Sequence, residues 1–392
     1  MIISLALLAQ VAIGASIPPF RGVNIHFTHQ RAGELAMLAK GFQGVRMDFS
    51  WSGIEKTAGQ YDFSAYDQLV TDLGSEQLFP YFILDYSNPL YDGGAPPHSD
   101  SGISAFVAFA HAALTRYAGK GIVWEMWNEP NGDNFWPPKH NATAYSRLAV
   151  AVGAMFKSAF PDEILVGPTT SGFDWDFITT TFQAGVLRYF DGVSVHPYRV
   201  APPETAARDF AALRSLVQQY APAGRGDLPL LSGEWGYTTC ELPCHEFGPF
   251  TTETQQAEYL ARQWLVEAAI GVPVSIWYDW HDDGSDPRER EQNFGTVTNL
   301  YHNASAPYTP KPSYVAAVTA RRLATGVSQH PQALAASLLS SDADGATAST
   351  PCGLPGGNTS DPLCYALLFS TAAGAAAGGA ERSLRGPPRQ TL

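Results

Sequence analysis

The segment IVWEMWNEPN, residues 122–131, decides how this chain can fold. Its apolar residues up to Met126 are typical of a buried strand, and the Asn-Glu-Pro-Asn tip is typical of the loop that ends such a strand. A carboxylate at this position, Glu129, is partly removed from water and therefore holds its proton more tightly than a solvated carboxylate does. This property suits a general acid, although a solvated side chain at a strand end is the alternative for one segment alone.

A second segment, LPLLSGEWG at residues 228–236, has the same form, because an apolar strand again ends in a glutamate, Glu234, beside a tryptophan. Two carboxylates at the ends of two strands are what cleavage of a glycosidic bond requires. The pair therefore favours a catalytic role over two unrelated solvated side chains.

The rest of the chain repeats a strand-then-helix pattern. Strands are expected at residues 21–27, 44–49, 78–84, 122–127, 164–167, 192–196, 228–233 and 274–278. Helices are expected at residues 34–40, 64–73, 103–117, 142–160, 177–188, 205–220, 254–270 and 313–324. This alternation indicates a parallel sheet, and eight units predict a closed (β/α)8 TIM barrel. An open doubly wound sheet is the rival, but no glycine-rich phosphate loop follows the first strand.

Composition limits the classes of function. The chain has 392 residues, 45% of them hydrophobic, which is enough for a large core. Its net charge of −13 argues against nucleic acid as a partner, because phosphate binding needs a basic surface. We expect a monomer that needs no metal or cofactor.

The two ends of the chain differ from the barrel. Residues 1–15 are typical of a secretory signal peptide, with cleavage after Ala15, and a buried N-terminal strand is the alternative. The catalytic barrel is expected over residues 16–326, and a short, incomplete C-terminal β-rich extension packed on it over residues 327–370. Residues 371–392 are rich in Ala and Gly, which indicates a disordered tail. We therefore expect a secreted protein with no membrane association after removal of the signal.

Four cysteines agree with secretion. Their spacing favours two local disulfides, Cys240 with Cys244 and Cys352 with Cys364, and a zinc site that includes His245 is the alternative. Possible glycosylation acceptors are Asn141, Asn303 and Asn358.

Polar and aromatic residues gather where the predicted strands end, and in a barrel this is the rim that carries chemistry. They are His26, Arg46, Asp48, Asp85, Tyr86, Asn128, Glu129, His196, Tyr198, Glu234, Trp277 and Asp279. So many together predict a site. Glu125 is four residues before Glu129 on the same strand, and we expect it to have a structural role paired with a core arginine.

With these motifs, the chain resembles a clan A glycoside hydrolase, most closely family 39 and next family 5. Four segments carry the resemblance: GVRMDFSW at 44–51, WNEPN at 127–131, HPY at 196–198 and GEWG at 233–236. The resemblance covers about residues 20–325. Members of family 39 usually carry a complete β-sandwich beside the barrel, and this chain has too few residues after the barrel for one.

The resemblance implies a role for each matching residue. Glu129 is expected to be the acid/base and Glu234 the nucleophile. Asn128 is expected to hold the 2-hydroxyl of the sugar, and Arg46 to keep Glu234 ionised. The implied mechanism is retaining, with the two carboxyl groups about 5–5.5 Å apart.

The other implied residues bind substrate. Tyr198 is expected to hydrogen-bond Glu234, His196 to line the same pocket, and Trp277 to lie under the sugar. Further sugar contacts are expected from His26, Trp136 and Trp235, with core packing as the alternative for these two tryptophans.

The resulting expectation is a secreted retaining glycoside hydrolase that cleaves O-glycosidic bonds of β-linked oligo- or polysaccharides, glucan or xylan first. A glycan-binding protein without turnover and a cell-wall transglycosylase are the alternatives.

Overall fold

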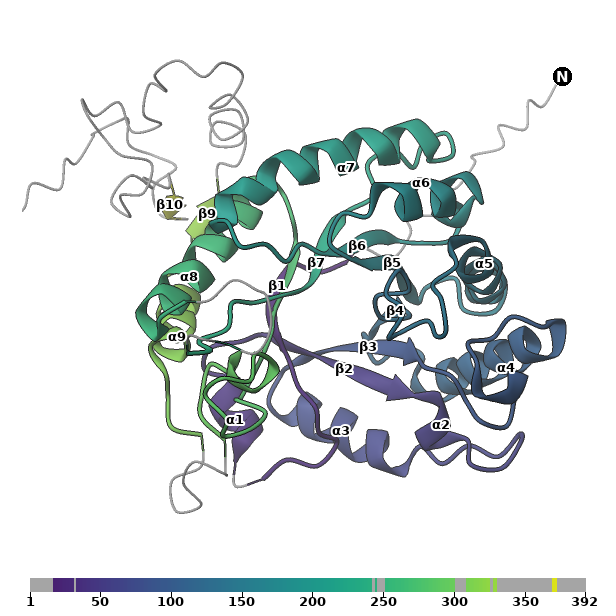
Figure 1. Cartoon of the computed structure of the whole chain (residues 1–392), viewed down its shortest axis with the longest axis horizontal. Helices are drawn as coiled ribbons and strands as arrows, with labels where there is room; N and C mark the ends of the chain where they lie inside the picture. The colour runs from purple at the N-terminus through teal and green to yellow at the C-terminus, as the bar shows by residue number, and fades with distance from the viewer. Residues whose placement is uncertain are drawn as a thin grey trace, which may run out of the picture.

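The computed structural model describes residues 17–31, 33–241, 244, 251–299, 308–324, 327–329 and 369–371. Eight parallel strands close into a barrel, and helices surround it (Figure 1). The strands are β1 (Phe20–Asn24), β2 (Gly44–Ser50), β3 (Phe79–Asp85), β4 (Val123–Met126), β5 (Ile164–Ser171), β6 (Gly192–His196), β7 (Leu230–Trp235) and β8 (Val274–Trp277). Because β1 pairs in parallel with β8 as well as with β2, the (β/α)8 prediction is confirmed and the open-sheet alternative is wrong.

The helices follow the predicted order. They are α1 (Glu34–Leu38), α2 (Trp51–Ile54), α3 (Ser64–Ser75), α4 (Asp100–Tyr117), α5 (Ala142–Ala159), α6 (Trp175–Gln183), α7 (Ala206–Tyr220), α8 (Glu253–Ala269) and α9 (Pro312–Ala324). Of these, α2 is an addition that the sequence pattern did not predict. α4 begins three residues before its predicted start because the side chain of Ser99 accepts a hydrogen bond from the Gly102 N–H at 3.0 Å and caps the helix. Apolar side chains on one face of each long helix then pack against the strands.

β5 is longer than predicted. The sequence pattern ends this strand at Gly167 because proline cannot donate a ladder hydrogen bond. The structure continues through Pro168 to Ser171, and the pairing with β6 shifts by one residue between Pro168 and Thr170. Such an irregularity accommodates the proline and brings the end of β5 beside the end of β4.

Side chains alternate along each strand between the barrel interior and the helices. On β4, Val123 joins the inner apolar cluster and Trp124 packs outward, so Glu125 faces the interior. The inner cluster consists of Phe20, Tyr81, Val123, Ile164, Val166, Leu231, Val274 and Ile276. It fills the interior below the C-terminal strand ends, where the inward positions become polar.

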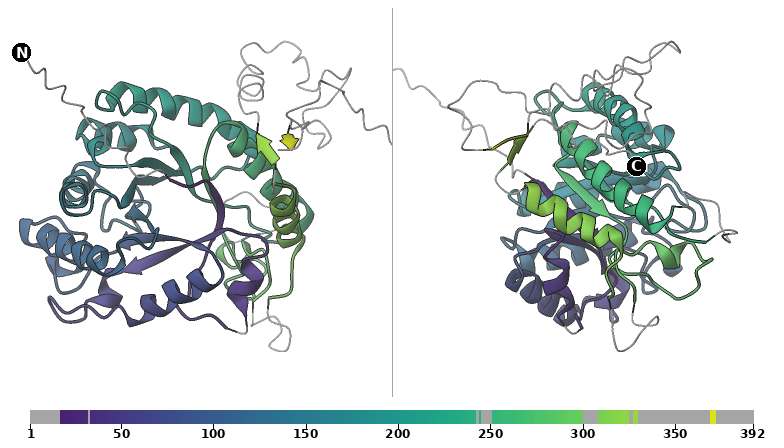
Figure 2. Two further views of the ribbon diagram at one scale, coloured as in Figure 1. Left: turned by 180° about the vertical axis from the view of Figure 1, so that it is seen from behind. Right: turned by 90° about the vertical axis from the view of Figure 1, so that its left-hand side faces the viewer.

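The C-terminal extension is described only in part. β9 (Val327–Gln329) and β10 (Phe369–Thr371) pair antiparallel and lie outside the ring of helices (Figure 2). The predicted signal peptide, Cys352, Cys364, Asn303, Asn358 and residues 372–392 lie outside the described residues. The domain boundaries therefore stay predictions. Within the described part of the chain, no helix combines the length and apolarity that crossing a bilayer requires.

Candidate active site

Arg46 is the centre of the polar cluster at the C-terminal strand ends. It faces the interior from β2, is 1% exposed, and donates hydrogen bonds to the carboxylates of Glu125 and Glu234. Its Nη2 also donates to Asn128 Oδ1 at 2.8 Å, and its Nη1 donates to Asn24 Oδ1 at 3.2 Å. A buried guanidinium is stable only when its donors are satisfied in this way.

Glu125 neutralises the arginine from below. It is fully buried and pairs with Arg46, and its second oxygen accepts a hydrogen bond from the Tyr81 hydroxyl. These contacts occupy both carboxylate oxygens beneath the cleft. The geometry agrees with the structural role expected for Glu125.

Glu234 is the carboxylate held by a cation and a hydroxyl. Arg46 Nη1 lies 2.5 Å from its Oε2, and the Tyr198 hydroxyl donates to its Oε1 at 2.8 Å. Hydrogen bonds from a cation and a hydroxyl stabilise the charged form of a carboxylate. The side chain is still 13% exposed, so a ligand can reach it.

An irregularity in β7 aims Glu234 inward. Between the pairs Ser232–Ser275 and Trp235–Trp277, β7 contains one residue more than β8. Such a bulge changes the alternation of side chains, which lets Glu234 face the interior while Trp235 packs outward. A glycine is required at position 233 of this bulge, because a Cβ there would lie 2.3 Å from Ser194 Oγ.

Glu129 is the carboxylate arranged to hold a proton. Burial raises its pKa from the ordinary 4.5 to about 7, although the Ser171 side chain and Arg46 act in the opposite direction. Its backbone is left-handed, with φ of 44°, and its N–H donates to the carbonyl of Thr169 at 3.0 Å. A conformation that non-glycine residues rarely adopt is thus held in place at the end of β4.

His196 connects the two halves of the cluster. It is fully buried, and burial lowers its pKa to about 4, so the ring is neutral at ordinary pH. Nε2 lies 3.2 Å from Arg46 Nη2, which can only donate, so the contacts assign the ring proton to Nδ1. Nδ1 is 2.8 Å from Glu129 Oε1 and donates to it. Any proton that Glu129 holds is therefore carried by Oε2.

The two carboxyl groups face each other across a short gap. One oxygen of Glu129, one oxygen of Glu234 and one nitrogen of His196 all lie within 4.8 Å of one another. Retaining glycosidases place their carboxyl groups about 5–5.5 Å apart, and inverting ones about 6.5–9.5 Å. The short distance between these oxygens agrees with the closer, retaining arrangement.

A second polar group lies across the cleft on the loops after β1 and β8. His26 Nε2 is 3.1 Å from Asp279 Oδ2, and Tyr278 packs edge-on against the imidazole. Desolvation lowers the pKa of His26, but the charge of Asp279 and its hydrogen bond outweigh this effect and raise the pKa to about 10. The His26 side chain is 41% exposed and so can contact a ligand.

Among the residues that the structure describes, two groups of side chains have atoms close enough together to hold a metal ion: Glu129 with His196 and Glu234, and His26 with Asp279 and Asp283. The zinc alternative at the cysteines is not supported, since Cys240 and Cys244 form a disulfide and offer no thiolate.

The three predicted tryptophan contacts do not fit the structure. Trp277 is 0% exposed, and Trp136 and Trp235 are also buried in the core. On β8, Val274 and Ile276 face the interior, so Trp277 faces the helices and packs near Tyr237. The next residue, Tyr278, is half-buried and faces the cleft.

The structure brings Glu129, Glu234, Arg46, Asn128, His196 and Tyr198 together, and His26 lies on the facing wall. Their chemical roles stay predictions. Sequence reasoning missed Tyr278, although counting alternate residues from Val274 would have found it. Tyr81 and Asn24 could not be predicted as members of the cluster, because the sequence does not distinguish an inward-facing polar residue on a strand from any other polar residue.

No protein-family model matches the chain. No curated protein matches it either. Solved structures, however, share its fold. A family 39 glycoside hydrolase from the gut symbiont Bacteroides cellulosilyticus WH2 superposes with a TM-score of 0.66 at 24% identity, over 79% of this chain and 64% of that chain.

Two other structures support the same comparison. A family 39 β-xylosidase from Caulobacter crescentus has a TM-score of 0.58 at 23% identity, covering 80% of this chain and 73% of that one. A family 5 subfamily 18 protein from Streptomyces cattleya, in complex with GlcNAc, has a TM-score of 0.58 at 16% identity, covering 79% of this chain and 80% of that one. At these identities the likeness shows the fold alone. The predicted resemblance to clan A glycoside hydrolases, with family 39 first, is therefore confirmed as a resemblance of fold.

Proposed function

We propose that this chain is a retaining glycoside hydrolase that cleaves β-linked oligo- or polysaccharides. One observation carries the proposal: a carboxyl group with a pKa raised to about 7, Glu129, lies within 4.8 Å of Glu234, which is held by an arginine and a tyrosine. Pairs of acids whose surroundings favour opposite protonation states divide the work of general acid and nucleophile.

The first step forms a covalent intermediate. Glu234 attacks the anomeric carbon through an oxygen, and the bond between that carbon and the glycosidic oxygen breaks. Glu129 Oε2 gives its proton to the departing oxygen, while the Nδ1–H of His196 keeps Oε1 in place. The leaving sugar departs as a neutral alcohol.

The second step releases the sugar from the enzyme. Glu129, now a carboxylate, takes a proton from water, and the resulting oxygen nucleophile attacks the anomeric carbon. The ester bond to Glu234 breaks, and both side chains return to their starting states. Net retention of the anomeric configuration follows from two inversions.

The substrate class is supported by the fold comparison. Several structural neighbours are described as β-xylosidases or β-glycosidases. We place xylan and glucan types first. A transglycosylase would use the same intermediate, with a sugar hydroxyl in place of water.

Secretion belongs to the same proposal. It is supported by the apolar character of residues 1–15 and by the Cys240–Cys244 disulfide, because such bonds persist in oxidising compartments. Detection of the protein in the culture medium, with residues 1–15 removed, is the expected result.

The deciding experiment is a panel of 4-nitrophenyl β-glycosides and β-linked polysaccharides assayed with wild type, Glu129→Ala and Glu234→Ala. We expect turnover by wild type with a product that first forms in the β configuration by NMR, and loss of activity in Glu234→Ala. Added acceptor sugar separates hydrolysis from transfer. Wild-type binding of a glycan without turnover on any member of the panel would support the binding-protein alternative instead.

A further inference from the structure

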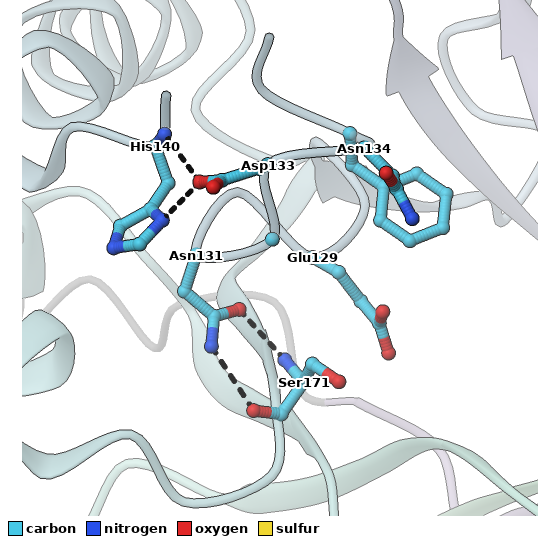
Figure 3. Close-up of a pocket in the computed structure, with 8 residues that line it drawn as sticks. Glu129, Asn131, Asp133, Asn134, His140 and Ser171 are labelled. Carbon is cyan, nitrogen blue, oxygen red and sulfur yellow. Dashed lines mark hydrogen bonds and ion pairs between the residues drawn. The ribbon is translucent and has the colours of Figure 1, made fainter. Parts of the chain in front are cut away.

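A pocket of about 430 Å³ opens beside Glu129, between the loop that follows β4 and the end of β5 (Figure 3). We call it the Glu129 pocket. The lining residues used below are Glu129, Asn131, Asn134, Phe135, His140 and Ser171. Its volume falls in the range of small-molecule sites.

The lining shows which side of the catalytic pair this pocket serves. It includes Glu129, the proposed acid, but not Glu234, Arg46 or Tyr198, which surround the proposed nucleophile. The group bonded to the nucleophile in the intermediate lies on the Glu234 side. The group that receives the proton of Glu129 leaves on the other side, where the Glu129 pocket lies.

The chemistry of the lining selects a neutral, hydroxyl-rich group. Asn134 is exposed and presents an amide at the pocket (Figure 3). The half-buried Phe135 lines the same pocket. Phe135 is stacked on Tyr86 at 5.9 Å between ring centres. Amide groups can hydrogen-bond sugar hydroxyls, and an aromatic face can cover the apolar face of a sugar ring.

Charge in the pocket is already compensated. The carboxylate of Asp133, which also lines it, lies 2.5 Å from His140 Nδ1 and 3.2 Å from Lys139 Nζ. Among the residues that line the pocket, the one basic side chain is thus paired with an acid. A carboxylate or sulfate on the leaving group would find no uncommitted cation in this lining.

The pocket is formed before any ligand binds. The side chain of Asn131 accepts from the Ser171 N–H at 2.8 Å and donates to the Ser171 carbonyl at 3.0 Å, which joins the loop to the end of β5 (Figure 3). The indole of Trp127 donates to the Phe135 carbonyl at 3.0 Å. Because these walls are fixed in advance, less conformational entropy is lost when a ligand binds.

We infer that the Glu129 pocket binds the leaving sugar, and that the bond cleaved joins two neutral sugar units. This inference rests on the proposed function and adds the leaving group to it. Asn134 and Phe135 are the residues that distinguish a sugar from a small leaving group.

The test compares two substrates that share the donor sugar on which wild type is most active. One is the β-glycosyl fluoride, whose small leaving group cannot fill the Glu129 pocket, and the other is the β-linked disaccharide. For Asn134→Ala we expect the ratio of kcat/KM for the disaccharide to kcat/KM for the fluoride to fall about fivefold, and for Phe135→Ala about tenfold or more. Gln219→Ala, which removes an exposed amide on α7 outside the lining, is the matched control and should leave the ratio unchanged.

The outcomes are separable. A wild type that hydrolyses neither substrate class contradicts the proposed function itself. A wild type that hydrolyses both, with an unchanged ratio in Asn134→Ala and in Phe135→Ala, overturns the inference alone. If Phe135→Ala does not fold, Phe135→Leu replaces it, because leucine fills the position without an aromatic face.

Discussion

At the scale of single residues, the proton on Glu129 determines the chemistry. In Glu129→Gln we expect kcat/KM for a β-linked disaccharide to fall about 10²–10⁴-fold, because the leaving oxygen no longer receives a proton. The loss should be much smaller for an aryl glycoside with a good leaving group, which departs without protonation. Steady-state kinetics on both substrates check this, and equal losses on the two would contradict the role of Glu129 as acid.

The pKa of Glu129 also predicts a pH profile. The acid must be protonated, so kcat/KM of the wild type should decline as the pH rises through about 7. Glu129→Gln, which cannot lose a proton there, should lack this decline. A decline that persists in the variant would assign it to another group.

The same pKa affects stability, with a defined sign. Glu129 ionises at about pH 4.5 in the unfolded chain and at about 7 in the folded one, so the folded state holds the proton more tightly. Wild-type stability should therefore fall between these pH values by on the order of 3 kcal/mol and level off above pH 7. Denaturant unfolding of wild type and Glu129→Gln at pH 4.5 and pH 8 measures this; a difference between them that does not vary with pH would contradict it.

At the scale of elements, the alternation of β8 decides which aromatic residue meets a ligand. We expect Trp277→Ala to lower the free energy of unfolding by about 3–5 kcal/mol, because it leaves a cavity between strand and helices. Tyr278→Ala should change stability far less but raise KM. Thermal melts and steady-state kinetics distinguish the two variants. A Trp277→Ala variant that is as stable as wild type but has a raised KM would show that Trp277 contacts the sugar after all.

Strand and helix positions could be predicted from apolar runs and periodicity, and so could the gathering of Arg46, Glu129 and Glu234 at one rim. The side that each residue faces could not always be predicted. The only mark that the bulge in β7 leaves in the sequence is Gly233, yet the bulge determines that Glu234 and not Trp235 faces the cleft. The predicted sugar contact of Trp277 was wrong for a simpler reason. A one-residue error in strand alternation exchanges the residues that face the barrel interior with those that face the helices.

The hydrogen-bond partners of the buried polar side chains could not all be predicted from the sequence either. The pairing of Glu125 with a core arginine was expected, but the contact between Tyr81 on β3 and Glu125 on β4 depends on the register of neighbouring strands. The tautomer of His196 depends on the distance to Arg46 and thus on the closed barrel. Such contacts follow from geometry that emerges only after the strands pair.

At the scale of the whole molecule, the loop after β8 is tied to the start of α9 by a buried ion pair. Lys311 Nζ lies 2.6 Å from Asp282 Oδ1, and both side chains are almost completely buried. We expect Lys311→Met to lower the free energy of unfolding by about 3–5 kcal/mol, because Asp282 then loses the buried ammonium group paired with it.

The double variant Lys311→Met/Asp282→Asn is the matched control, since it removes both charges and should recover part of that loss. Denaturant titration of both single variants and the double variant provides the cycle. Strictly additive losses would show that the two side chains are not coupled.

The cluster around Arg46 has one further consequence. Before reaction, five side chains of the cluster sum to one negative charge: Arg46 is positive, its ion-pair partners Glu125 and Glu234 are counted as carboxylates, and Glu129 and His196 are neutral. In the proposed intermediate, Glu234 becomes a neutral ester while Glu129 becomes an anion, so the sum is again one negative charge. The surrounding dipoles then face the same total on both sides of the barrier, and the protein has little to rearrange as the bond breaks.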